Sequence, residues 1–95
     1  MLSACSHAGV INAATSAAQL SDSGLDLVLG GYHLAGKIME QRIPQTVDAL
    51  RNLNPRLVAP GHCTGWRAKA ALAKEFSTDD RYAPSVVGTK YVLTA

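Results

Sequence analysis

Short apolar runs separated by helical segments are the feature that most constrains how this chain folds. Apolar runs bounded by glycine or proline occur at Leu2 to Ala4, Leu25 to Leu29, Arg56 to Ala59 and Val86 to Leu93. Runs of this length are typical of buried β-strands. Helical segments lie between them, so the order β-α-β-α-β-α-β indicates an α/β layer structure. A chain of 95 residues has room for one small domain.

Three segments carry the apolar spacing of a helix. The first places these residues on one face: Val10, Ile11, Ala14, Ala17 and Ala18. The opposite face of this segment is polar but uncharged, which predicts that the helix packs against other protein segments on more than one side. The second predicted helix runs from about Pro44 to Leu53. The third follows Thr64, the predicted N-cap, and ends near Phe76, and residues 37–42 form a further short helical turn.

Composition and charge limit the class of protein. Hydrophobic residues make up 47% and charged residues 17% of the chain, which indicates a packed globular protein. No apolar run approaches the roughly 18 residues that span a membrane, so we expect a soluble protein with no membrane partner. The formal net charge of +2 gives no argument for a nucleic-acid partner. Two cysteines are too few for a disulfide scaffold, and we expect a reducing, cytoplasmic setting.

The start of the chain predicts an incomplete domain. A strand usually takes about 5 to 6 residues, yet Met1 already occupies a strand position in the first apolar run. We therefore expect residues 1–95 to be a single partial domain that lacks its N-terminal half.

The first third of the chain carries little charge. Asp22 and Asp26 are the charged residues of the first 36 positions, so this third should be buried. If the missing half leaves apolar surface uncovered, self-association should follow.

Three histidines carry the main chemical signal. His7, His33 and His62 each follow a predicted strand within a few residues. The carboxyl ends of parallel strands meet at one edge of a sheet, so these imidazoles could converge there. Three neutral imidazoles with an open position describe a catalytic metal site. The alternative for each is a hydrogen-bonded or surface histidine, and for His33 the two interpretations weigh equally.

Residues beside the histidines are candidates for binding substrate: Ser6, Gly9, Tyr32 and Thr64. The first helix begins near Gly9 or Val10, and its free N–H groups would face the same edge and favour an anionic group. The eight glycines form neither a GxGxxG nor a P-loop pattern, so no nucleotide site is predicted.

Cys5 and Cys63 allow three interpretations. With His7 and His62 they would form a closed Cys2His2 structural zinc site, although the spacings do not match the usual zinc knuckles. Buried, inert thiols are the favoured interpretation. The third is a Cys63 nucleophile with a histidine base, which adjacency in sequence supports only weakly.

Three ordered motifs resemble the C-terminal half of a metallo-β-lactamase-fold hydrolase. They are Ala4-Cys5-Ser6-His7-Ala8-Gly9-Val10-Ile11-Asn12, Gly30-Gly31-Tyr32-His33-Leu34 and Pro60-Gly61-His62-Cys63-Thr64-Gly65. The segment from Tyr82 to Thr89 is similar as well, so the resemblance covers essentially the whole chain. The branch it resembles is the one labelled dihydropterin ribofuranosyl-aminobenzene phosphate synthase-like.

This resemblance implies half of an αββα sandwich with a divalent metal, expected to be zinc, at one edge between the sheets. A complete domain of this family holds one or two ions. His7 and His62 match metal-ligating histidines of the family. The superfamily usually places a bridging Asp between them, but the matching stretch from Leu29 to His33 has no acid. The resemblance therefore leaves His33 as a substitute ligand or a substrate contact.

The resemblance further implies hydrolysis of an ester or phosphoester-type bond in a small-molecule substrate by metal-activated water. The superfamily motif HxHxDH supplies most ligands of the first metal, and it does not occur in these 95 residues. We therefore predict that the isolated chain is inactive or nearly so unless a separate N-terminal half docks onto it. Two alternatives remain: a non-catalytic α/β interaction or binding module, and a small structural zinc protein. Specificity should lie in the loops His33 to Arg42 and Arg81 to Ser85.

Overall fold

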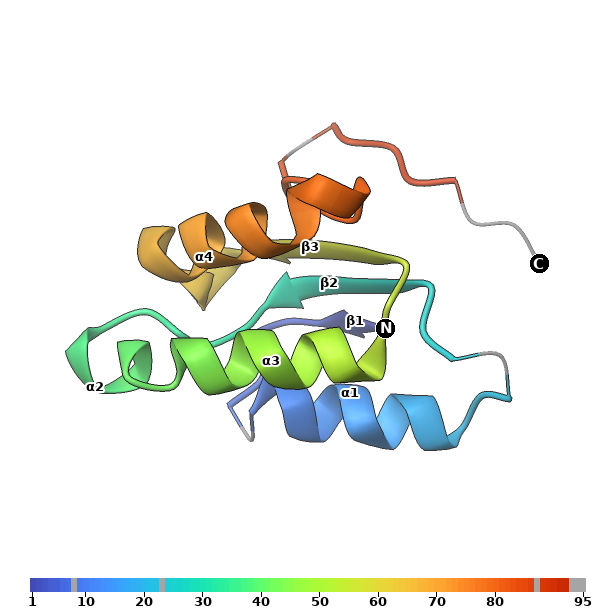
Figure 1. The fold of residues 1–95 in the computed structure, drawn as a ribbon, viewed down its shortest axis with the longest axis horizontal. Helices are drawn as coiled ribbons and strands as arrows, with labels where there is room; N and C mark the ends of the chain where they lie inside the picture. Colours follow the sequence, from blue (N-terminus) through green and yellow to red (C-terminus); the bar gives the residue numbers. More distant parts are fainter. Residues whose placement is uncertain (8, 23, 87, 93–95) are drawn as a thin grey trace.

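Three parallel strands form the sheet of this protein, in the order β1-β2-β3. A computed structural model describes residues 1–7, 9–22, 24–86 and 88–92. The strands are β1 (Leu2–Ser3), β2 (Leu27–Gly31) and β3 (Leu57–Gly61). β2 lies in the middle, paired with β1 on one side and with the whole length of β3 on the other. Figure 1 shows the three strands running in the same direction.

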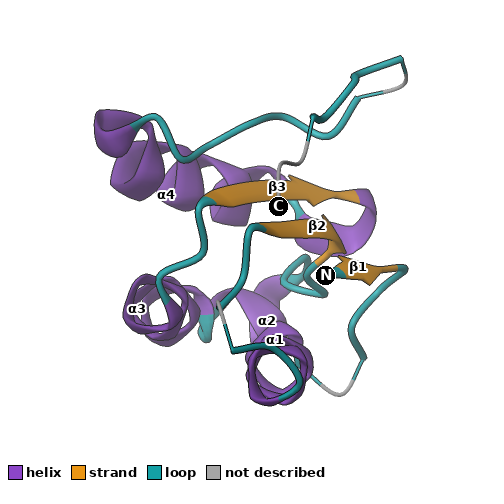
Figure 2. Cartoon of the chain, turned by 90° about the vertical axis from the view of Figure 1, so that its right-hand side faces the viewer, coloured by secondary structure: helices purple, strands orange, loops and turns teal. Residues whose placement is uncertain are grey.

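Helices occupy the connections between the strands. They are α1 (Val10–Gln19), α2 (Lys37–Glu40), α3 (Ile43–Leu53) and α4 (Trp66–Phe76), with the 3₁₀ turns η1 (His62–Thr64) and η2 (Ser77–Asp79) on either side of α4. Both crossovers lead to the next strand in the same direction, so right-handed connections place α1 and α3 on one face. Figure 2 shows α1 and α3 together below the sheet, with α4 above α3 and beside β3. No helix among the described residues is long and apolar enough to cross a membrane.

One apolar core lies between the sheet and its helices. Val28 and Val58 from the strands meet Leu50 from α3 and Leu72 and Phe76 from α4, and all five are completely buried. Burying a side chain of this size contributes about 1.5–3 kcal/mol. The predicted helical spacing of α3 and α4 therefore marks the faces that hold the helices on the sheet.

Two glycines allow β1 to lie close beside the end of β2. Gly30 has a φ of +133°, and a Cβ atom there would overlap the carbonyl oxygen of Ser3. A Cβ atom at Gly31 would overlap the carbonyl of Ala4, which instead accepts a hydrogen bond from the Gly31 N–H at 3.1 Å. Only glycine tolerates the positive φ at Gly30 and the lack of space for a Cβ atom at both positions. This pair of glycines therefore determines how closely the first two strands approach.

The predicted α/β class is confirmed, but one predicted strand does not form. The first three strand predictions are each shifted or shortened by a residue or two. The strand predicted from Val86 to Leu93 is wrong at positions 86 and 88–92, while 87 and 93 lie outside the described residues. Tyr82 instead forms an isolated parallel bridge with Val58, and the Val58 N–H donates to the Arg81 carbonyl at 2.7 Å. The free edge of β3 is thus already used before residue 86.

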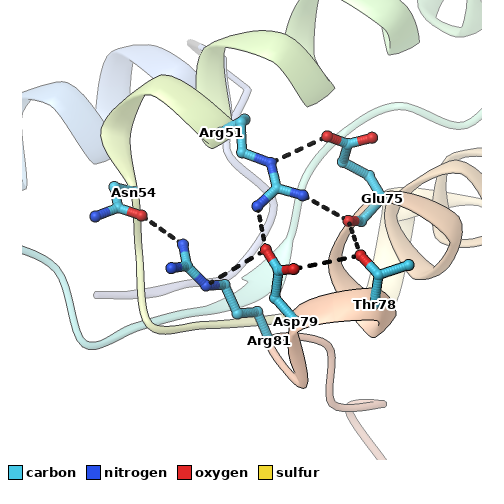
Figure 3. A network of polar contacts seen from close by, with 6 residues as sticks. All are labelled: Arg51, Asn54, Glu75, Thr78, Asp79 and Arg81. Carbon is cyan, nitrogen blue, oxygen red and sulfur yellow. Dashed lines mark hydrogen bonds and ion pairs between the residues drawn. The ribbon is translucent and has the colours of Figure 1, made fainter.

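A polar network ties α3 to α4 and η2 (Figure 3). Arg51 of α3 donates to the Glu75 side chain at 3.0 Å and to the Glu75 backbone carbonyl at 2.7 Å. The same guanidinium donates to Asp79, which Arg81 approaches at 3.9 Å. The hydrogen bond from Arg51 lowers the pKa of the Asp79 carboxyl below its usual value. The network therefore fastens the end of α4 to α3 beside the apolar core.

Replacing Asp79 with Asn should lower the free energy of unfolding at neutral pH, because Arg51 and Arg81 lose their shared carboxylate. The lowered folded-state pKa means that this stabilisation is present above about pH 4, the unfolded value, and is lost as the pH falls through the folded value. Urea unfolding of Asp79→Asn and the unmodified protein between neutral and strongly acid pH measures the difference. Asp48→Asn, at an exposed position of α3, is the control. Equal effects at both positions would contradict the network's role.

Candidate functional site

The three histidines lie beyond the carboxyl ends of the three strands. His7 follows β1, His33 follows β2, and His62 follows β3 directly. All pairings in the sheet are parallel, so these ends share one edge. The edge that the strand pattern predicted is therefore present, and the assignment of the histidines as metal ligands stays a prediction.

His7 and His33 form a pair. Their rings stack with centroids 4.5 Å apart and planes inclined by 30°. His7 is exposed and His33 is half-buried, so the pair lies at the surface of the edge. The stack connects the loop after β1 to the loop after β2.

His62 belongs to a second group, with the two cysteines. Its Nδ1 atom lies 3.3 Å from the Cys5 Sγ atom, and the Cys63 thiol donates to the Cys5 carbonyl at 3.3 Å. The possible ligand atoms of these three residues all lie within 4.8 Å of one another. Among the described residues, the three histidines do not lie this close to one another. His7 and His33 are not part of the group of Cys5, His62 and Cys63.

This arrangement narrows the interpretations of the cysteines. The closed Cys2His2 site needed His7, which stacks on His33 instead. The thiol beside the His62 ring is that of Cys5 rather than Cys63. Partial burial and the neighbouring Cys63 raise the pKa of the Cys5 thiol above its usual value. The raised pKa disfavours a thiolate at Cys5, the cysteine that lies beside the imidazole.

The backbone is strained at this edge. Ser6, His33 and His62 have φ values of 63°, 56° and 45°, in the left-handed region that residues with a Cβ atom rarely adopt. The other described non-glycine residues in this region, Asn54 and Asp80, end α3 and η2, where such a conformation is common. The left-handed residues that do not end a helix therefore lie around the candidate site. Strained residues also gather at functional sites in other proteins.

Thr64 holds two of the loops together. It is completely buried, and its hydroxyl donates to the Gly61 carbonyl at 2.6 Å and accepts from the Tyr32 N–H at 3.1 Å. The prediction that Thr64 caps α4 is wrong, because Gly65 occupies the N-cap and no side chain caps the helix. The hydroxyl is already engaged by the strand ends, so Thr64 supports the edge from within the protein.

A cavity of about 280 Å³ opens beside the His7–His33 pair. The candidate substrate-binding residues Ser6, Gly9 and Tyr32 line it, whereas Thr64 does not. Polar residues that were not predicted as site residues also line it: Asn12, which ends the first motif, and Arg42, Gln45 and Thr46, which lie outside the motifs. The described lining contains no carboxylate, so its charge comes from Arg42, together with any proton on the two imidazoles. The sequence feature that could have identified Arg42 was the loop from His33 to Arg42, where specificity was expected.

Tyr32 anchors the inner wall of this cavity. Its ring is 1% exposed, and its hydroxyl donates to the Val28 carbonyl at 2.6 Å. Burial raises the pKa of this phenol well above its ordinary range. The side chain therefore stays protonated and serves to position the loop that carries His33.

Comparisons with known proteins give relatives much longer than this chain. No family model matches it. The chain is 34% identical over 80 residues to a 7,8-dihydropterin-6-methyl-4-(β-D-ribofuranosyl)-aminobenzene-5′-phosphate synthase of Methanocaldococcus jannaschii, covering 83% of this chain and 27% of that protein. It is 32% identical over 74 residues to the uncharacterized protein MJ0448 of the same organism, covering 78% of this chain and 27% of the relative. The chain thus spans 27% of the length of both curated relatives.

A solved structure extends the similarity to the fold. The crystal structure of Tm1679, a metal-dependent hydrolase of the β-lactamase superfamily, matches with a TM-score of 0.85 and 30% identity. The match covers 99% of this chain and 36% of that one. The sheet and its helices therefore match a half of a metallo-β-lactamase fold, as the motifs predicted.

The donor atoms at the edge fit a divalent metal of the kind this similarity suggests. Imidazole nitrogens and thiol sulfurs are ligands that zinc and related ions prefer in proteins. The possible ligand atoms of Cys5, His62 and Cys63 lie within 4.8 Å of one another. The similarity supports a divalent metal without specifying zinc.

Replacing Thr64 with Val should lower the free energy of unfolding by about 1–3 kcal/mol, because a buried backbone N–H and carbonyl lose their partner. Urea unfolding measures the change. Thr15→Val, on the exposed face of α1, is the matched control and should change stability by less than about 0.5 kcal/mol. Equal stability of Thr64→Val and the unmodified protein would show that the hydroxyl does not hold these loops.

Proposed function

We propose that this chain forms part of a metal-dependent hydrolase that acts on an ester or phosphoester-type bond in a small-molecule substrate. The observation that carries the proposal is the common edge, where three strand ends are each followed by a histidine and a cavity opens beside His7 and His33. The similarity to Tm1679, a metal-dependent hydrolase, supports the same class of chemistry. The similarity to the pterin-related synthase supports a phosphate-bearing small molecule.

His7, His33 and His62 are the proposed metal ligands. A divalent ion supplies Lewis-acid stabilisation of the negative charge that develops during hydrolysis of such a bond. The chain's own contribution is to hold its imidazoles in place before the reaction. The stack between His7 and His33 and the clamp that Thr64 forms between strand ends both limit their movement.

The substrate occupies the cavity beside these rings in this proposal. Gly9 and Val10 at the N-terminus of α1 line the cavity, and no side chain caps that helix end. The positive end of the α1 dipole and the Arg42 guanidinium both favour an anionic group. With no carboxylate in the described lining to oppose it, the cavity should prefer a phosphate or carboxylate substituent.

A complete centre needs ligands beyond those of residues 1–95 in this proposal. We expect a companion segment, joined to this chain or separate, to supply them. Six large apolar side chains of the described residues are 63% to 90% exposed: Leu2, Leu20, Ile38, Trp66, Val86 and Val92. Such side chains offer contacts for a companion segment or for a second copy of this chain.

The isolated chain should bind a divalent metal yet hydrolyse generic phosphodiester and ester substrates little faster than the free ion. Equilibrium dialysis with zinc or cobalt measures uptake, and p-nitrophenol release measures hydrolysis. His7→Ala should reduce metal affinity at least about tenfold, while Gln19→Ala, on the exposed face of α1, should not.

Mixing the chain with the separately produced remainder of the similar M. jannaschii synthase tests the hydrolase proposal itself. Metal-dependent hydrolysis that neither piece shows alone is the expected result, because the added segment would complete the centre. Robust turnover by the isolated chain would contradict the predicted inactivity. Absence of hydrolysis from a stable mixture that binds metal would contradict the hydrolase proposal.

Replacing Arg42 with Gln should weaken binding of phenyl phosphate about tenfold or more, because charged hydrogen bonds contribute about 1.5–3 kcal/mol. Titration followed by NMR measures the affinity. Arg56→Gln is the control, since Arg56 is an exposed arginine that pairs with Asp26 at 3.5 Å and lies outside the cavity lining. Equal affinities of Arg42→Gln and Arg56→Gln would contradict anion binding in the cavity.

A further inference from the structure

We propose that Thr46 is a specificity-determining residue of the cavity beside His7 and His33, where its hydroxyl forms a hydrogen bond with the ligand. The ligand class that fits is a ring-sized anion with a hydroxyl group opposite its phosphate or carboxylate. This inference rests on the proposed function, because it places the anionic group of the ligand at Arg42. It adds a feature of the ligand that Arg42 alone does not select.

Thr46 is a buried polar residue whose hydroxyl has no partner within the described part of the chain. The residue is 8% exposed and lines the cavity. The hydroxyl makes no hydrogen bond with another described residue, whereas that of the buried Thr64 both donates and accepts. Every described buried side-chain N or O atom that is closed off from solvent has a partner, so the Thr46 hydroxyl reaches the open space of the cavity. Such a group is available to a ligand.

One face of α3, together with the N-cap residue before it, lines the cavity. Four residues belong to it: Arg42, Gln45, Thr46 and Ala49. Their spacing of three and four positions places them on the same side of the helix. The Thr46 N–H donates to the Arg42 carbonyl at 2.9 Å, so the two residues lie one turn apart, about 5.4 Å along the axis. Arg42 is exposed and Thr46 is buried, so Thr46 lies deeper in the cavity.

Apolar side chains make up much of the remaining lining. Val10 and Leu34 are buried there, and Met39 of α2 adds a flexible apolar side chain. The volume of about 280 Å³ lies just below the roughly 300–1,000 Å³ of most small-molecule sites. The space therefore suits a single apolar ring, with its anionic group at Arg42 near the mouth and its hydroxyl group at Thr46 inside.

A buried hydroxyl discriminates between ligands of the same shape. It favours a ligand that forms a hydrogen bond with it, and it disfavours one that leaves it unpaired. para-Hydroxyphenyl phosphate and para-methylphenyl phosphate are such a pair, since they differ only in the group opposite the phosphate. We expect the unmodified protein to bind the hydroxyl compound about three- to tenfold more tightly than the methyl compound.

Titration of the full 95-residue chain with each compound, followed by NMR, tests this preference. Thr46→Val keeps the shape of the side chain without its hydroxyl, so it should remove the preference or reverse it in favour of the methyl compound. Thr46→Ser keeps the hydroxyl and should retain the preference. Thr15→Val, on the exposed face of α1, is the matched control and should behave as the unmodified protein does.

A preference that persists in Thr46→Val, or that the unmodified protein lacks, would overturn the role of Thr46. Urea unfolding checks that Thr46→Val is folded, and the comparison of the two compounds on the unmodified protein does not depend on that variant. Weaker phosphate binding by Arg42→Gln without any hydroxyl preference would overturn the role of Thr46 alone. Binding of neither compound by the unmodified protein would overturn both that role and the anion site, whereas the hydrolase chemistry is judged by hydrolysis in the mixture with the synthase segment.

Discussion

The parallel pairing of β1, β2 and β3 is the constraint on which the rest of this structure depends. Each strand ends in a loop that carries one histidine, and parallel pairing brings those loops to the same edge. Gly30 and Gly31 permit the close approach of β1 to β2, since a Cβ atom at either position would overlap a β1 carbonyl or the residue beyond it. An antiparallel β1 would carry His7 to the opposite edge. The chemistry therefore depends on backbone packing before any side chain contributes.

The loops at this edge are held by one another. Thr64 joins the ends of β2 and β3, the Cys63 thiol reaches the Cys5 carbonyl, and His7 stacks on His33. Left-handed residues such as His33 and His62 cost about 1–3 kcal/mol each and persist only where their surroundings hold them. The completely buried core of β2, β3, α3 and α4 supplies the stability that such strain requires. Rigid strands and strained loops thus belong to one arrangement.

Regular elements and their common edge could be predicted from sequence because they depend on local periodicity. The apolar spacing of α3 and α4 identified the buried Leu50 and Leu72, and strand order identified the edge. The absence of a strand at residues 86 and 88–92 could not be predicted, because Arg81 and Ala83 already pair with β3. Thr64 matched the usual N-cap pattern, yet the strand ends compete for the same hydroxyl. Such competition between partners is a tertiary property.

The separation of His62 from His7 and His33 illustrates the same limit of prediction from sequence. Three imidazoles at equivalent positions are interchangeable in sequence, but the left-handed φ values of His33 and His62 turn these two side chains according to their own loops. His33 consequently meets His7 beside the cavity, while His62 meets the Cys5 thiol. The described cavity lining includes His7 and His33 and excludes Cys5, His62 and Cys63, so a molecule bound there contacts the two imidazoles and Arg42 rather than the two thiols.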